Sequence, residues 1–174
     1  MIKQDIYENQ VKVAYLGIGS NLGNKNYNIE TAKFNLQFYN IKILKCSSNY
    51  ESLSWPDPTK PKFINIIVKI ETSLSPIELL KICNLIELKL GRKRSVKNKP
   101  RTCDIDIIDY DQKIFEIKKN PNLNLPHPGI EKRNFVLIPL FEISKSWKHP
   151  KTKVNIGKLI NSMPIDDLRS IKAI

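Results

Sequence analysis

Two aspartates set two residues apart, Asp104 and Asp106, are the side chains of this chain best placed to do chemistry. They lie in an isoleucine-rich run, which favours a β-strand, and successive side chains of a strand alternate between its two faces. Both carboxylates would therefore project from one face, about 7 Å apart, while Cys103, Ile105 and Ile107 line the other. Two like charges this close repel each other unless a cation lies between them. The pair predicts either a solvent-facing polar strand or a site for a divalent cation.

A cationic segment comes immediately before the acid pair. Five of the eight residues from 92 to 99 are lysine or arginine, and Arg101 follows them. Such a run is often only a solvated loop, but next to two acids it also fits phosphoryl transfer. That chemistry uses Mg²⁺, held by one or two carboxylates and phosphates, together with cations that neutralise charge on the transferred group. We therefore expect a phosphoryl-transfer site, with residues 92–99 forming a lid that orders over the nucleotide.

The length and charge of the chain limit the classes of protein it can belong to. Its 174 residues suit one domain with a substantial core. The formal net charge of +12 indicates an anionic partner, which could be nucleic acid, an acidic membrane surface or a phosphorylated small molecule. The lysines are scattered along the chain, however, and this favours general solubility over a dedicated nucleic-acid surface. Biased base composition is an equally simple source of the excess.

Cysteine and histidine usage points away from a disulfide or zinc protein. Cys46, Cys83 and Cys103 are odd in number and follow no metal-ligand spacing, so they are expected to be reduced and buried. The two histidines are too few for a histidine-rich metal site. The N-terminus lacks the apolar core of a signal peptide, and no apolar run approaches the roughly 20 residues of a membrane span. We expect a cytoplasmic protein.

The elements that must position the acid pair alternate between strands and helices. Residues 51–62 contain three prolines and are expected to be an irregular loop, as are residues 120–129. The patterns predict strands over 11–18, 41–50, 63–71 and 113–118 and around the acid pair, and helices over 27–38, 76–90, 134–144 and 155–161.

The second of these helices has the clearest start. Ser75 can cap it, Pro76 fits the first helical position, and Glu78 completes a capping box. Gly91 is expected to end the helix.

Two further motifs are weaker. Gly17, Gly19 and Gly23 follow the first strand, but their spacing is not that of a dinucleotide fingerprint and no Lys-Ser/Thr of a P-loop follows. A tight turn with close backbone approach is the better interpretation. His127, between two prolines, is more often structural than catalytic in such a setting.

Three aromatic residues, Trp55, Phe63 and Phe135, could either belong to the core or stack on a flat ligand. Phe63 shares one face of the predicted 63–71 strand with the polar Asn65, while aliphatic residues fill the opposite face. A flat bicyclic ligand held between aromatic rings is a natural use for an aromatic on the polar side.

Taken in order from about residue 12 to 165, the chain resembles the 6-hydroxymethyl-7,8-dihydropterin pyrophosphokinases. The segments that carry the resemblance are Ala14–Gly23, Phe63–Asn65, Glu71–Leu74, Glu87–Arg94, Pro100–Ile107, Pro126–His127 and Arg133–Leu140.

The resemblance implies an α+β fold, in which helices flank an antiparallel sheet in an α/β/α sandwich of ferredoxin-like layout. It also implies an enzyme of folate biosynthesis that moves the diphosphate of ATP onto the hydroxymethyl group of the pterin and releases AMP. The expected cofactors are two Mg²⁺ ions acting in an in-line mechanism. We expect one domain over 12–174 after an extension over 1–11, acting as a monomer with neither nucleic acid nor membrane as a partner.

The resemblance further implies roles for individual residues. Asp104 and Asp106 would bind the metal and, with Arg92 and Arg101, form the catalytic group. The residues expected to bind ATP are Leu80, Asn84, Glu87, Arg92, Arg94, Arg101, Ile107, His127 and Arg133. Those expected to bind the pterin are Gly19, Ser52, Leu53, Trp55, Phe63, Asn65 and Phe135.

The chain departs from the family pattern in its loops. Ser52–Ser54 stands where Thr-Pro-Pro is common, residues 95–99 lack a frequent Trp-Gly, and Asn122 replaces a frequent arginine. Two other functions remain open on the residues alone: a basic nucleic-acid-binding domain, and a kinase that transfers a single phosphoryl group. The nucleotide product, AMP or ADP, separates these possibilities.

Overall fold

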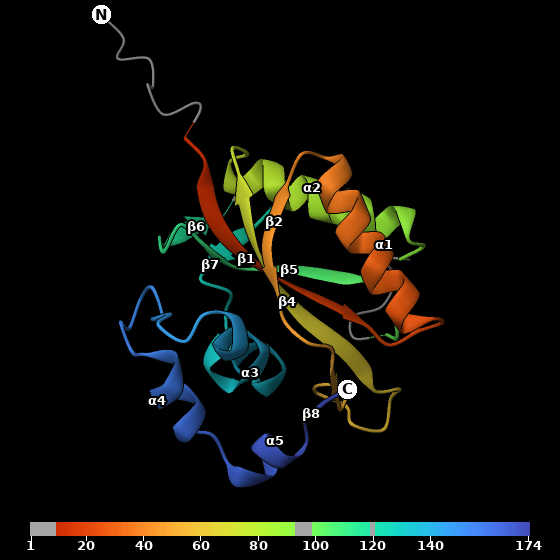
Figure 1. Cartoon of the computed structure of the whole chain (residues 1–174), viewed down its shortest axis with the longest axis vertical. Helices are drawn as coiled ribbons and strands as arrows, with labels where there is room; N and C mark the ends of the chain where they lie inside the picture. The colour runs from red at the N-terminus through yellow and green to blue at the C-terminus, as the bar shows by residue number, and fades with distance from the viewer. Residues whose placement is uncertain (1–9, 93–98, 119–120) are drawn as a thin grey trace, which may run out of the picture.

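The computed structural model describes residues 10–92, 99–118 and 121–174. An antiparallel sheet forms the middle of the molecule (Figure 1). Along the sheet the strands lie in the order β5 (Asp104–Tyr110), β1 (Lys12–Ser20), β4 (Phe63–Thr72), β3 (Tyr50–Ser52) and β8 (Lys172–Ala173), and β2 (Lys42–Cys46) also pairs with β4. A separate two-stranded sheet joins β6 (Phe115–Ile117) to β7 (Leu123–Leu125).

Helices cover both faces of the main sheet, so the predicted α/β/α layering is confirmed (Figure 1). On one face α1 (Lys25–Phe38) and α2 (Pro76–Lys89) enclose an apolar cluster. On the other face α3 (Asn134–Ile143) and α4 (Ile156–Asn161) pack on a second apolar cluster. A 3₁₀ turn, η1 (Ile130–Lys132), comes before α3, and α5 (Ile165–Arg169) follows α4.

The start and end of α2 agree with the sequence pattern. Ser75 and Glu78 form the complete capping box, and Pro76 occupies the first turn. After the helix Gly91 has a φ of +82°, a left-handed conformation that glycine adopts without a Cβ clash. These local signals fix where the segment ahead of β5 begins.

Short elements depart from the predictions. The strand expected over 41–50 is two strands, because the polar stretch between them bonds through side chains. There the Ser47 hydroxyl accepts from the Ile67 amide at 2.9 Å. The loop expected over 51–62 begins two residues late, since β3 extends to Ser52. The loop expected over 120–129 contains β7, whose Leu123 and Leu125 are buried in the α1/α2 cluster. Neither α5 nor β8 was predicted.

An irregularity interrupts the pairing of β5 with β1. Ile107 lies opposite Leu16, but Tyr15 lies opposite Asp109, so Ile108 is an extra residue on β5. This is a β-bulge, and it shifts the alternation of the strand by one position. Ile108 and Asp109 consequently both lie on the side of the α3/α4 cluster, where Asp109 meets Trp147, while Ile107 and Tyr110 both pack in the α1/α2 cluster.

Two predictions fall largely outside the described residues. Of the expected extension 1–11 the structure describes only the last two residues, and β1 begins at Lys12. Of the expected lid it describes Arg92 and Lys99 but not the residues between them. In the described part of the chain, no helix is both long and apolar enough to cross a membrane.

Candidate active site

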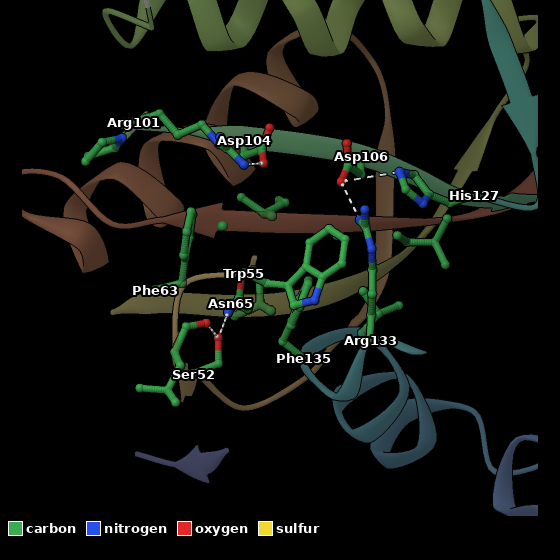
Figure 2. A pocket seen from close by; sticks show the side chains of 18 of the residues that line it. Ser52, Trp55, Phe63, Asn65, Arg101, Asp104, Asp106, His127, Arg133 and Phe135 are labelled. Atoms are coloured by element: carbon green, nitrogen blue, oxygen red, sulfur yellow. Dashed lines mark hydrogen bonds and ion pairs between the residues drawn. The ribbon is translucent and has the colours of Figure 1, made fainter. Parts of the chain in front are cut away.

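A pocket of about 560 Å³ opens where the first half of β5 faces the start of α3 across strands β1, β4 and β3 (Figure 2). It gathers most of the predicted site residues, although they come from distant parts of the sequence. These residues are Gly19, Ser52, Leu53, Trp55, Phe63, Asn65, Arg92, Arg101, Asp104, Asp106, His127, Arg133 and Phe135.

The acid pair points into this pocket from one face of β5, as the alternation of the strand predicts (Figure 2). Cys103, which precedes the first acid, and Ile105, which lies between the two, are buried on the opposite face of the strand in the α1/α2 cluster. The two-residue spacing therefore serves to present both carboxylates to the same space.

Two arginines neutralise the first acid. Asp104 Oδ1 lies 2.6 Å from Arg92 Nη1, and Asp104 Oδ2 lies 2.6 Å from Arg101 Nη2. Arg92 also pairs with Glu87 of α2, whose buried carboxylate accepts from the Ile105 amide at 2.7 Å. Burial alone would lower the pKa of Arg92, but Asp104 and Glu87 more than offset this and raise it. The guanidinium therefore stays charged.

The second acid is held more loosely. Asp106 Oδ2 lies 3.5 Å from Arg133 Nη1 and 3.7 Å from His127 Nε2. Burial and the neighbouring Asp104 carboxylate raise the pKa of Asp106, whereas burial lowers the pKa of His127. Added positive charge favours the ionised form of a carboxylate, and a bound cation would supply it beside Asp106.

The opposite wall of the pocket carries the aromatic residues. Phe63 and Asn65 share one face of β4, and Asn65 Nδ2 donates to Ser52 Oγ at 2.9 Å (Figure 2). Gly19 lies beside them on β1, where an added Cβ would stand 2.7 Å from Asn65 Oδ1 and 3.3 Å from the Phe63 ring. A glycine is therefore required here so that these side chains can approach the backbone.

Arginine side chains lie over the aromatic rings of the pocket. The Arg133 guanidinium carbon is 5.5 Å from the centre of the Trp55 ring and 5.8 Å from that of Phe135. The Arg101 guanidinium carbon is 5.4 Å from the centre of the Phe63 ring. Trp55 remains 61% exposed, so a flat ligand can reach its ring.

Several predicted residues lie elsewhere. Leu80, Asn84, Glu87 and Ile107 do not line the pocket. The Ile107 side chain packs in the α1/α2 cluster, and the Glu87 side chain lies behind Arg92. Arg94 is outside the described residues.

Sequence reasoning did not assign other lining residues, which are Gly17, Ile18, Ile66, Lys99, Pro100, Ile108 and Val136. Lys99 belongs to the basic run, so its charge was the available signal. The aliphatic ones carry no such signal because they resemble ordinary core residues.

The donor set fits Mg²⁺ better than a metal caged by protein alone. No cluster of three or more histidine, cysteine or acidic side chains suited to a metal occurs in the described ranges. Two carboxylates from β5 nevertheless match the preference of Mg²⁺ for few protein ligands together with phosphates and water. Two buried polar atoms of residues that line the pocket, Arg101 Nε and His127 Nδ1, have no hydrogen-bond partner within the described part of the protein. Such groups normally find partners, so this end of the pocket is suited to a polar ligand.

Comparisons with known proteins agree with this geometry. The model of the 7,8-dihydro-6-hydroxymethylpterin-pyrophosphokinase family matches residues 15–145. A 2-amino-4-hydroxy-6-hydroxymethyldihydropteridine pyrophosphokinase of Aquifex aeolicus is 40% identical over 136 residues, which are 78% of this chain and 82% of the relative. The folic acid synthesis protein fol1 of Schizosaccharomyces pombe is 36% identical over 159 residues. That match spans 91% of this chain but only 21% of the yeast protein.

Solved structures show the same fold. Wild-type HPPK-DHPS of Plasmodium falciparum, crystallised with pteroate, superposes with a TM-score of 0.71 at 15% identity. The superposition covers 88% of this chain and 42% of the Plasmodium chain. At this identity the likeness concerns the fold alone, and it places the antiparallel sheet with its flanking helices among these proteins.

Proposed function

Because this chain belongs to the 7,8-dihydro-6-hydroxymethylpterin-pyrophosphokinase family, a family of transferases, we propose that it transfers the diphosphate of ATP to 6-hydroxymethyl-7,8-dihydropterin. The products would be the pterin diphosphate and AMP, in folate biosynthesis. One observation carries the proposal: a single pocket joins a wall of paired acids and cations to a wall of aromatic and amide side chains. The first wall suits phosphates and the second suits a flat, polar heterocycle. We place this activity in one domain over residues 12–174.

The acid wall would bind the nucleotide phosphates. Arg92, Arg101 and Arg133 each reach an Asp carboxylate, and guanidinium forks match phosphate oxygens as well as they match carboxylates. The three arginines would move from carboxylate to phosphate when ATP enters. They would then stabilise the negative charge on the transferred group.

Asp104 and Asp106 would hold Mg²⁺, two ions as the resemblance implies. Bound there with the phosphates, magnesium would neutralise charge and make the β-phosphorus more electrophilic. Burial lowers the pKa of His127, and we assign it the role of a hydrogen-bonding group to the nucleotide. Keeping the pocket walls rigid would orient the two substrates for an in-line transfer.

The aromatic wall would bind the pterin. We propose that Phe63 and Phe135 stack on its rings, with Trp55 covering the open side. Asn65 and Ser52, already hydrogen-bonded to each other, can exchange that bond for bonds to the amide-like edge of the heterocycle. Leu53 and Gly19 complete the shape of this wall.

The proposal is tested by identifying the nucleotide product, AMP or ADP. Purified protein incubated with ATP, Mg²⁺ and 6-hydroxymethyl-7,8-dihydropterin should form AMP and the pterin diphosphate in equal amounts. A matched incubation without the pterin should leave ATP intact. Formation of ADP would instead indicate transfer of a single phosphoryl group. Failure to turn over, combined with salt-sensitive binding of DNA or RNA, would support a nucleic-acid-binding domain.

A further inference from the structure

Asn21, directly after β1, makes hydrogen bonds in two directions and lines no part of the pocket. On one side its Oδ1 accepts from the Arg101 backbone amide at 2.8 Å, and the backbone amide of Asn21 donates to the Arg101 carbonyl at 3.1 Å. This two-point bond fixes the backbone from which the Arg101 side chain reaches Asp104. Asn21 is only 3% exposed, so neither bond competes freely with water.

The side-chain nitrogen of Asn21 bonds to the loop that carries Trp55 of the aromatic wall. Asn21 Nδ2 donates to Ser54 Oγ at 3.3 Å and to the Pro61 carbonyl at 3.1 Å. The Ser54 hydroxyl in turn donates to the same Pro61 carbonyl at 2.6 Å. Ser54 comes directly before Trp55, and Pro61 comes two residues before Phe63, so these bonds close the base of the loop.

An amide is the side chain that this position requires. The carbonyl oxygen must accept from a backbone amide, while the two hydrogens of the nitrogen must reach two acceptors. Aspartate has the same shape, but it would turn an oxygen towards the Pro61 carbonyl and offer no donor. Alanine would leave a buried amide, a hydroxyl and a carbonyl short of a partner.

We propose that Asn21 is a positioning residue that holds the Arg101 backbone and the 54–61 loop at a fixed separation. It thereby sets the distance between the phosphate wall and the pterin wall. The inference rests on the proposed function, because it assigns those walls to the two substrates. It adds a residue that touches neither substrate and acts through Arg101 on one side and through the Trp55 loop on the other.

Two substitutions at Asn21 should separate its effect on Arg101 from its effect on the 54–61 loop. Asn21→Asp keeps the acceptor for the Arg101 amide and loses the donors to the loop. We expect the Kd of the pterin to rise about tenfold, the cost of one or two buried hydrogen bonds, and kcat to stay within about threefold of wild type. Asn21→Ala also removes the side-chain acceptor for the Arg101 amide and leaves only the backbone bond to Arg101, so kcat should fall about 10- to 100-fold in addition. Quenching of Trp55 fluorescence in a Trp147→Phe background measures pterin binding.

A double-mutant cycle with Arg101→Ala shows whether the rate effect passes through Arg101. Without the guanidinium its position no longer matters, so Asn21→Ala should lower kcat less than about threefold in that background. Independent, multiplying effects would overturn the proposal. Asn155→Ala is the matched control, since Asn155 caps α4 outside the pocket by accepting from the Gly157 amide at 2.8 Å. It should lower the melting temperature without changing kcat or the pterin Kd.

The outcomes separate this inference from the proposed function. If the wild-type protein forms no AMP from ATP and the pterin, the proposed function fails. If wild type is active and folded Asn21→Ala keeps wild-type kcat and pterin Kd, only the role of Asn21 is overturned. Where Asn21→Ala does not fold, Ser54→Ala retains both bonds to Arg101 and should raise the pterin Kd while leaving kcat unchanged. An unchanged Kd in Ser54→Ala and in Asn21→Asp would equally refute the link to the loop.

Discussion

The two ends of strand β5 carry aspartates in opposite settings. At its start Asp104 and Asp106 face an open pocket and are paired with cationic side chains. Towards its end Asp109 is 1% exposed, and neutral donors satisfy it. Trp147 Nε1 donates to Asp109 at 2.8 Å, and both the backbone and the side chain of Gln112 also donate to it.

The contrast shows that the partners of a carboxylate, more than its residue type, decide what it can do. Cationic partners can leave a carboxylate for a phosphate, so the first pair is suited to exchanging ligands. The Trp147 indole is buried and cannot leave Asp109 without becoming unsatisfied, so Asp109 has a structural role. Burial raises the pKa of Asp109 despite the hydrogen bonds from Trp147 and Gln112.

The largest expected difference between the two ends is in the rate of diphosphate transfer. Asp106→Asn should lower kcat at least about 1,000-fold, because a metal ligand contributes several kcal/mol to the transition state. We choose Asp106 for this substitution because its ion pairs are longer than those of Asp104, so its loss should disturb the fold less. Asp109→Asn, the matched variant, should keep kcat within about threefold. Similar losses of rate in the two variants would break the comparison.

The next effect is stabilisation by ligand. With Mg²⁺ and a non-hydrolysable ATP analogue at about 100 times Kd, wild type and Asp109→Asn should each gain about 2.7 kcal/mol of unfolding free energy. Asp106→Asn should gain much less, as should wild type when EDTA removes Mg²⁺. Thermal melts with and without the analogue measure these gains. An undiminished gain in EDTA would contradict the assignment of Asp104 and Asp106 as metal ligands.

Removing the Asp109 carboxylate should lower the stability of the fold and leave catalysis unchanged. Asp109→Ala leaves the buried Trp147 Nε1 without its acceptor, so the free energy of unfolding should fall by about 1–3 kcal/mol. Urea titration measures this loss, and kcat per folded molecule should not change. In the Trp147→Phe background, which has no indole donor, the same substitution should cost less. An equal cost in both backgrounds would show that the indole bond is not the source.

The smallest expected effect is a dependence of stability on pH. Because the pKa of Asp109 is raised in the folded protein, its contribution is fully present below its unfolded pKa of about 3.9 and is lost as pH rises through the folded value. Asparagine does not titrate. The unfolding free energy of Asp109→Asn minus that of wild type should therefore increase with pH over that window, as urea titrations at successive pH values can show. A difference that falls with pH would mean that the pKa of Asp109 is lowered instead.

Sequence patterns were most informative where structure is local. The alternation of Asp104, Ile105 and Asp106 correctly placed both acids on one face, and the Ser75 capping box correctly placed a helix. The resemblance also named residues from distant segments, such as Arg133, that the fold brings into the same pocket. Alternation alone could not have placed them there, because it carries no information about which segments meet.

The remaining features depend on contacts distant in sequence. Asp109 bonds to a tryptophan 38 positions away, and Asn21 bonds to Arg101 80 positions away, so neither role has a local signature. The strands β7 and β8 are three and two residues long, and pairing with a neighbour defines them more than propensity does. The lid over 92–99 stays a prediction.

The extra residue at Ile108 has a consequence for how this gene can change in length. Beyond the bulge the alternation of β5 is reversed, which sends Tyr110 into the α1/α2 cluster and leaves Asp109 on the side of Trp147. Because Ile108 has no partner on β1, deleting its codon would restore a regular strand and keep Asp109 and Tyr110 on their present sides. Were β5 regular at its present length, the two side chains would exchange sides and a carboxylate would enter an apolar core. The loop over 53–62 has no such phase to keep, so insertions and deletions can accumulate there.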